Sequence, residues 1–233
     1  MRKKLNQYLR RTSGLENALL LIIPWLIIYN LGTILTDFRT MNGVDLFTPA
    51  VIRLSGLKGF LICNGLILLV GGFTYFRTIK NKNKTPLTFT DPLYLLAEAA
   101  LYSAILGTLV AMAMSEVPYV SITVPEKGLY VFISAGAGVY EELIFRMLMI
   151  AGLLAWLESG GRKAPFIHTS IALIISSVVF SLAHYLGPES FQLYTFLYRT
   201  FAGLLLGGIF LVRGLAVAVY THVMYNLWAF LLN

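Results

Sequence analysis

The chain has 233 residues, of which 58% are hydrophobic and only 12% are charged, and its mean hydropathy is +0.76. An ordinary soluble domain carries roughly 25% charged residues, so this composition excludes a soluble globular protein and predicts a polytopic membrane protein. The formal net charge of +7 does not indicate a nucleic-acid partner, because the basic residues fall in short blocks between apolar runs.

Seven apolar segments are long enough to cross a bilayer, which takes a helix of roughly 20 residues. The sequence therefore predicts an all-α transmembrane bundle, with residues 1–233 as one integral-membrane domain and residues 1–15 as a basic tail. The lone cysteine, Cys63, excludes an intramolecular disulfide, so helix packing must hold the fold. The predicted spans lie near residues 16–37, 56–77, 93–115, 128–157, 166–187, 190–212 and 214–232.

The basic residues in the connections predict the orientation of these spans. A cytoplasmic N-terminus places twelve Lys and Arg inside and four outside, so we expect a multi-pass protein of the cell membrane with its N-terminus in the cytoplasm. The first span follows a charged start but is long and lacks a small-residue cleavage site, so we expect it to remain in the protein.

Small residues and isolated charges within the spans predict close packing. The fourth span is too long for one simple crossing, and we expect it to tilt or to break at residues 135–138, whose Ala-Gly-Ala-Gly sequence allows another backbone to approach. Gly203 and Gly207 have the spacing of a helix contact. Glu98 is expected to line a cavity or to pair with Arg199.

Two acids and a base interrupt the fourth apolar run as Glu141-Glu142-Leu-Ile-Phe-Arg146. Ionisable groups at membrane depth are costly unless they pair or face a cavity, so such a cluster indicates a function or a structural ion pair. Residues four apart share a helix face, which makes Glu142 and Arg146 a candidate ion pair with the acid first, the favourable order. Glu141 is then expected to point elsewhere, without a local counter-charge, and is the candidate for chemistry.

Two further pairs at helical spacing strengthen the chemical interpretation. Phe180 lies four residues before His184, and His222 lies four residues before Asn226, so each pair shares one helix face. A lone histidine in a span is as often a core residue as a functional one. Two histidines, a glutamate and an amide on three C-terminal spans favour a shared site among residues 128–232.

These side chains are of the types that peptide hydrolysis needs. Glu141 can take a proton from water, because burial moves a carboxylate toward the basicity of a general base, and His184 can share that water. His222 and Asn226 can donate to the oxyanion that forms when water adds to a carbonyl. Glu141, His184 and His222 also form a known ligand set for catalytic zinc, although the sequence has no H-E-x-x-H helix and Glu141 could not easily act as both ligand and base.

The three motifs together, Glu-Glu-x-x-x-Arg, Phe-x-x-x-His and His-x-x-x-Asn, in this order on the fourth, fifth and seventh predicted spans, resemble the CPBP family of intramembrane proteases, which includes the type II CAAX prenyl endopeptidases and bacteriocin-processing enzymes. The resemblance covers about residues 130–230 and implies an intramembrane endopeptidase with seven or eight spans. It implies that Glu141 and His184 activate the water, that His222 and Asn226 stabilise the oxyanion, and that Glu142, Arg146 and Phe180 support the site.

The resemblance also implies the partners of the chain. The family has been described both as metal-dependent and as glutamic-type, and we favour the second, with no cofactor and zinc as the alternative. The expected partners are the lipid bilayer and a membrane-anchored or lipidated peptide or protein, and no nucleic acid. A transporter or proton relay, which also uses intramembrane Glu, His and Arg, and a scaffold without activity are the alternative functions.

Overall fold

The computed structural model describes residues 2–40, 42, 44–45, 47–80, 85–117, 126–159, 165–186 and 189–232, and within these ranges it is helical without a strand. The predicted all-α class is therefore confirmed. Lys82, Lys84, Arg162 and Lys163, which entered the prediction of orientation, lie outside the described residues.

The described helices follow the predicted order along the chain. Those of the first half are α1 (Arg2–Ser13), α2 (Leu15–Leu35), α3 (Phe47–Lys80) and α4 (Asp91–Met114). Those of the second half are η1 (Lys127–Leu129), α5 (Tyr130–Gly136), η2 (Ala137–Ile150), α6 (Ala151–Glu158), α7 (Pro165–Ala183), η3 (His184–Leu186), α8 (Leu193–Arg213) and α9 (Leu215–Leu232).

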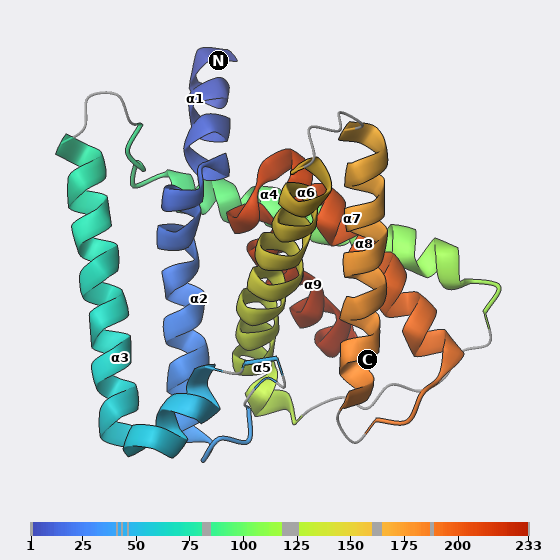
Figure 1. Cartoon of the computed structure of the whole chain (residues 1–233), viewed down its shortest axis with the longest axis horizontal. Helices are drawn as coiled ribbons and strands as arrows, with labels where there is room; N and C mark the ends of the chain where they lie inside the picture. The colour runs from blue at the N-terminus through green and yellow to red at the C-terminus, as the bar shows by residue number, and fades with distance from the viewer. Residues whose placement is uncertain are drawn as a thin grey trace.

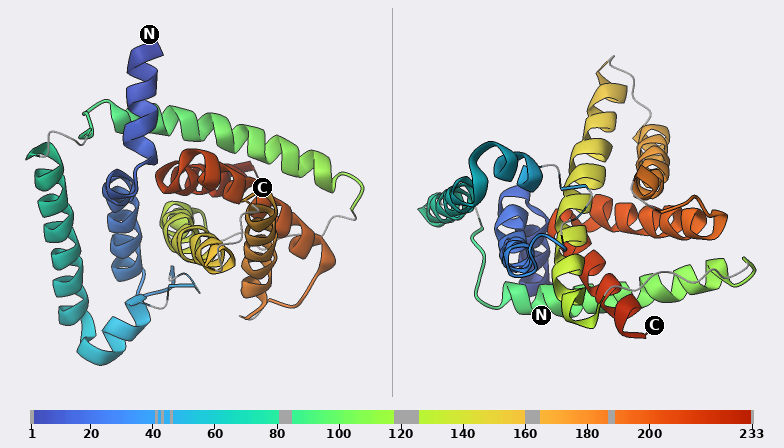
Figure 2. Two further views of the ribbon diagram at one scale, coloured as in Figure 1. Left: turned by 45° about the horizontal axis from the view of Figure 1, so that its top comes forward. Right: turned by 90° about the horizontal axis from the view of Figure 1, so that it is seen from below.

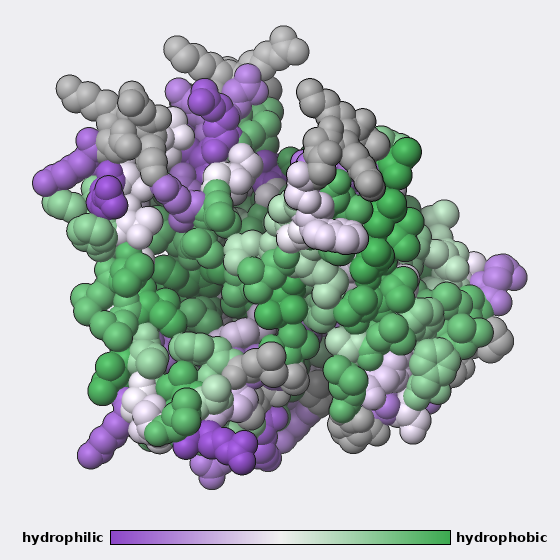
Figure 3. All heavy atoms as spheres, viewed as in Figure 1, coloured by the Kyte–Doolittle hydropathy of each residue, from purple (hydrophilic) through white to green (hydrophobic). Residues whose placement is uncertain are grey.

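Five helices in the described part of the chain are long and apolar enough to cross a membrane: α2, α3, α4, α7 with η3, and α8. They correspond to five of the seven predicted spans. The other two fall on the composite helix from η1 to α6 and on α9, which is a shorter apolar helix. Large apolar side chains such as Leu69 are exposed along these helices, as expected of surfaces that face lipid. Figure 3 shows them as an apolar band with hydrophilic residues gathered at its two ends.

The second-half helices pack around the composite helix. Figures 1 and 2 show α2, α3 and α7 nearly parallel, with the composite helix passing between α2 and α7 and α4 lying across one side. The helix α9 runs obliquely and contacts α4, α2 and η2. A buried cluster of Ala, Val and Leu side chains from α2, α4, η2 and α9 forms the main core.

The predicted break at residues 135–138 is not found. The helix continues through this stretch, and from Ala137 to Ile150 it is wound as a π-helix, in which hydrogen bonds join residues five apart rather than four. A π-helix has more residues per turn than an α-helix, so neighbouring side chains are separated by a smaller angle. This change of winding covers all three charged residues of the fourth span.

The Ala-Gly-Ala-Gly stretch does allow close approach, as predicted. A Cβ on Gly138 would lie 2.3 Å from Cγ2 of Val223, and 3.1 and 3.2 Å from backbone atoms of Val219 and Val223 in α9. A Cβ on Gly136 would lie 2.5 Å from the ring of Tyr29 in α2. The two glycines therefore set the distance from the composite helix to its neighbours on either side.

Replacing Gly138 by alanine is expected to lower the free energy of unfolding by about 1–3 kcal/mol, because the added methyl group overpacks a contact with backbone. The measurement is thermal unfolding of the purified protein in detergent. Gly208→Ala is the control, since a Cβ there meets nothing within 4 Å. Equal stability of the two variants would contradict the close contact between η2 and α9.

The expected pairing of Glu98 with Arg199 is wrong. Glu98 of α4 accepts hydrogen bonds from Arg213 at 2.6 and 2.9 Å and from Tyr8 at 2.5 Å, whereas Arg199 pairs with Glu189 at 2.8 Å. Helical spacing fixes only local neighbours, so it did not identify these distant partners. The contacts also show that the basic tail forms a helix, α1, which is held against α4 and the end of α8.

Candidate active site

The acidic motif of the fourth span is buried in η2. Glu141, Glu142 and Arg146 have relative exposures of 5%, 0% and 1%. Nε of Arg146 lies 3.2 Å from Oε2 of Glu142, so the predicted ion pair is present. Two acidic side chains and one basic side chain thus lie together in this buried group.

His222 of α9 lies between the two acids. Its Nδ1 is 2.8 Å from Oε1 of Glu142, and its Nε2 is 3.7 Å from Oε2 of Glu141. The expectation that Glu141 points elsewhere than Glu142 is therefore wrong, since both acids face His222. It assumed the side-chain spacing of an α-helix, whereas the smaller angle between neighbours in the π-helix directs both acids toward α9.

Phe180 of α7 links the three motifs. The guanidinium carbon of Arg146 lies 4.4 Å from the centre of the Phe180 ring. The rings of His184 and His222 approach the same ring edge to face, with centroid distances of 5.1 and 6.2 Å. A cation over an aromatic face is attracted by the ring quadrupole, so Phe180 contributes to holding Arg146 as well as orienting both imidazoles.

The hydrogen bond of His184 fixes its tautomer. Nδ1 lies 2.9 Å from the backbone oxygen of Phe180. A carbonyl only accepts hydrogen bonds, so Nδ1 carries a proton, and in the neutral tautomer with that proton Nε2 is the acceptor. The side chain is half-buried at the start of η3, where α7 ends.

Asn226 is half-buried one helical turn after His222 on α9. Its side chain makes no hydrogen bond with the described part of the chain. The structure thus brings Glu141, Glu142, Arg146, Phe180, His184 and His222 into one connected group and leaves the amide of Asn226 beside it, unbonded within the described residues.

Among the described residues, no three His, Cys, Asp or Glu side chains are grouped so as to hold a metal ion. The alternative zinc ligands Glu141, His184 and His222 are among the residues searched, and zinc binding by them stays a prediction. Both nitrogens of His222 face carboxylates, and Nδ1 of His184 is occupied by a carbonyl.

Three contacts of the site were not anticipated from the sequence. Nδ2 of Asn42, in the connection between α2 and α3, donates to Oε1 of Glu141 at 2.9 Å. Ser176 of α7 donates to the backbone oxygen of Phe145 at 2.5 Å, and Nη2 of Arg146 donates to the backbone oxygen of Gly203 at 3.4 Å. Asn42 has no spacing that relates it to the motifs, so the sequence offered no signal for its contact, whereas Ser176 lies four residues before Phe180 and Gly203 was expected to mark a helix contact.

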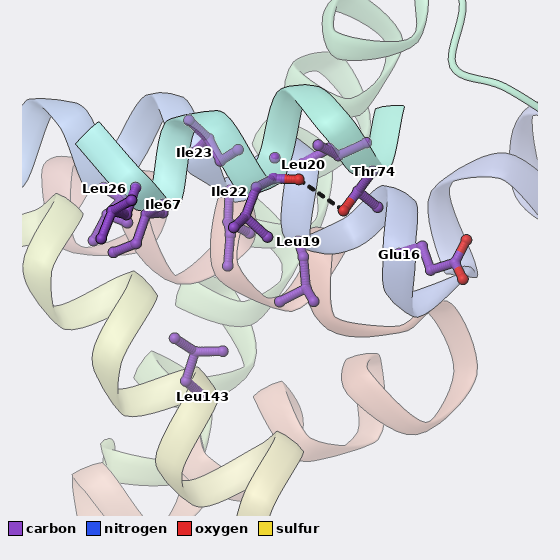
Figure 4. A pocket seen from close by; sticks show the side chains of 12 residues that line it. Glu16, Leu19, Leu20, Ile22, Ile23, Leu26, Ile67, Thr74 and Leu143 are labelled. Atoms are coloured by element: carbon purple, nitrogen blue, oxygen red, sulfur yellow. Dashed lines mark hydrogen bonds between the residues drawn. The ribbon is translucent and has the colours of Figure 1, made fainter. Parts of the chain in front are cut away.

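An apolar cavity of about 440 Å³ lies between α2 and α3, away from the charged group (Figure 4). Its walls are aliphatic side chains of the two helices, and Leu143 of η2 contributes to its lining. Leu143 directly follows the two acids in sequence, so the cavity and the charged group lie on different faces of the same helix.

Comparison with known proteins bears on the same segment. The model of the family described as type II CAAX prenyl endopeptidase Rce1-like matches residues 123–228, a little under half of the chain. Searches of curated proteins and of solved structures gave no match. The family match supports an intramembrane endopeptidase in general. The resemblance inferred from the three motifs is therefore confirmed by the match of residues 123–228 to the Rce1-like family model of type II CAAX prenyl endopeptidases.

Proposed function

We propose that the protein is an intramembrane endopeptidase of the glutamic type, in which Glu141 and His184 activate the water that attacks a peptide carbonyl. One observation carries the proposal. In the segment that matches an endopeptidase family, a buried carboxylate, Glu141, faces the imidazole of His222 across 3.7 Å. That distance is too long for a direct hydrogen bond, and it allows one oxygen atom to contact both groups.

In the proposed reaction, Glu141 takes one proton from water as the water oxygen bonds to the carbonyl carbon of the substrate. The unprotonated Nε2 of His184 accepts a hydrogen bond from the same water and orients it. The proton on Glu141 then passes to the amide nitrogen as the carbon–nitrogen bond breaks. The products are a carboxylic acid and an amine, and passage of the acid proton to the amine gives a carboxylate and an ammonium group, so atoms and charge balance.

His222 and Asn226 are proposed to donate to the oxyanion. His222 can do so from an N–H group at Nε2, the nitrogen that faces Glu141. The amide of Asn226 has donors that no described residue occupies. Preformed donors in a dry site stabilise developing negative charge more strongly than water does.

The proposed substrate is a peptide or protein that is anchored in or lipidated at the membrane. The family name indicates prenyl endopeptidases, and the buried charged group belongs to a chain with several helices that are long and apolar enough to cross a membrane. We also propose a cytoplasmic N-terminus on the basis of the twelve and four basic residues. Labelling of single cysteines placed at Arg77 and Arg39 from either side of the membrane tests that orientation.

The proposed function is tested with purified protein in proteoliposomes that contain membrane-anchored peptides, in water enriched in ¹⁸O. Cleavage with incorporation of ¹⁸O into the new carboxyl group, seen by mass spectrometry, is the expected result. The peptides should include some with prenylated anchors and some with unprenylated anchors, so that the two kinds of substrate can be compared. Gradient-driven solute flux without any cleaved peptide would instead support the transporter.

Exhaustive chelation separates the glutamic reaction from the zinc reaction. We expect the protein to retain its rate of cleavage and to contain substoichiometric zinc, because Glu141 acts directly on water. A zinc enzyme would lose activity on chelation and regain it on addition of zinc. Stoichiometric zinc in the wild type that is absent from His184→Ala and His222→Ala would contradict the proposal.

A further inference from the structure

The connection between α2 and α3 contributes a side chain to the charged group from far outside the family-matched segment. Nδ2 of Asn42 donates to Oε1 of Glu141 across 2.9 Å, and the two residues are 99 positions apart. Resting on the proposed function, we propose that Asn42 is a positioning residue, which holds the carboxylate of Glu141 so that its other oxygen, Oε2, faces Nε2 of His222.

The amide of Asn42 is itself held in one orientation. Its Oδ1 accepts a hydrogen bond from the backbone nitrogen of Val44 at 2.8 Å, so Nδ2 is the end that faces Glu141. Its backbone nitrogen donates to the hydroxyl of Tyr29 at 3.0 Å. An amide has distinct donor and acceptor ends, and with Oδ1 occupied the donor end is directed at the carboxylate.

Tyr29 connects this residue to the rest of the fold. Its side chain is fully buried, and its hydroxyl donates to Oδ2 of Asp45 at 2.7 Å. Oδ1 of Asp45 accepts from the backbone nitrogen of Thr48 at 2.9 Å, in the first turn of α3. The position of Asn42 is thus set by α2 and by the start of α3.

The same tyrosine also contacts the helix that carries Glu141. Its ring lies 2.5 Å from the place that a Cβ of Gly136 would take, and the ring centroids of Tyr29 and Tyr140, the residue before Glu141, are 5.3 Å apart. Tyr29 therefore contacts both Asn42 and the helix that carries Glu141, and it fixes the position of one relative to the other. The hydrogen bond from Asn42 can therefore orient the carboxylate of Glu141.

Orientation matters because a general base must present its lone pair at a defined place. A carboxylate can rotate about its last bond, and a hydrogen bond to one oxygen restricts that rotation. Misplacement of a reacting group by about 1 Å can cost about 10²-fold in rate. Asn42 would therefore affect the rate of the chemical step more than the binding of substrate.

The first test replaces Asn42 by aspartate, which has nearly the same shape. Asp keeps the acceptor for Val44 and replaces the donor with an oxygen that faces the carboxylate of Glu141. We expect kcat to fall by roughly 10–100-fold with KM changed less than about threefold. Asn64→Asp is the matched control, because Asn64 bonds to Asn30 and to the oxygen of Phe60, and its kcat should remain that of the wild type.

A second test measures the contact without using activity. Asn42→Asp should lower the melting temperature in the wild type, because two carboxylates then face each other. In a Glu141→Gln background the same change should lower it much less, since the glutamine amide can donate to the new aspartate. Thermal unfolding of the four proteins in detergent gives this double-variant cycle.

The possible results separate the two proposals. A selective fall in kcat together with non-additive melting temperatures supports the positioning role of Asn42. The positioning role is overturned if the changes in melting temperature of the two single variants add up to that of the double variant. It is also overturned if these changes do not add up but kcat of Asn42→Asp equals that of the wild type. Full cleavage by Glu141→Gln would instead overturn the proposed function, while the melting temperatures would still report on the contact.

Discussion

Glu141→Gln is expected to lower the rate of peptide cleavage by roughly 10²–10⁴-fold, to or near the background rate. The amide has almost the shape of the carboxylate but cannot take a proton from water. Its oxygen can still accept the hydrogen bond from Asn42, so the melting temperature should change little. Initial rates of cleavage in proteoliposomes and thermal unfolding in detergent are the two measurements.

The control for this variant is Glu158→Gln, the same chemical change at an exposed glutamate at the end of the same composite helix. It should cleave at the wild-type rate. A rate for Glu141→Gln within about threefold of the wild type would show that Glu141 is not the base. The melting curve shows whether Glu141→Gln is folded, so a low rate of cleavage that comes from unfolding is distinguished from the loss of the base.

Arg146→Ala is expected to lower the free energy of unfolding by about 3–5 kcal/mol, which is the typical result of removing one partner of a buried ion pair. Glu142 is fully buried, and after the change it keeps only the imidazole of His222 as a polar partner among the described residues. The change also removes the cation from the ring of Phe180. Thermal or denaturant unfolding in detergent measures the loss.

Two comparisons show whether the buried charge causes this loss. Arg199→Ala removes an arginine from the partly exposed pair with Glu189, and such pairs contribute about 0–1 kcal/mol. Adding Glu142→Gln to Arg146→Ala should restore part of the stability, because no uncompensated carboxylate remains. Equal stability of Arg146→Ala and Arg199→Ala would contradict the role of the buried ion pair.

The sequence predicted those features that depend on local spacing. The apolar runs predicted the five long helices, because burial in lipid requires about 20 apolar residues in succession. The four-residue spacing predicted the pair Glu142–Arg146, and the glycines at residues 136 and 138 predicted close approach of neighbouring helices. Each of these follows from the geometry of one helix.

Features that depend on winding or on distant segments were not predicted. Glu141 lies against His222 because η2 is a π-helix, and no residue type in that stretch marks the change from α-helical winding. Asn42 reaches Glu141 through a connection in the other half of the chain. Arg213, rather than Arg199, pairs with Glu98, because tertiary folding selected between two arginines on the same helix.

The most direct test of the central claim compares the peptides in cells that express the wild type, Glu141→Gln or Glu158→Gln. If the charged group on η2 hydrolyses peptide bonds, the wild type and Glu158→Gln should produce the same new peptide ends from membrane-associated proteins, and Glu141→Gln should lack them. Identical peptide ends in all three, with equal amounts of folded protein, would contradict the assignment of Glu141 as the base of an intramembrane endopeptidase.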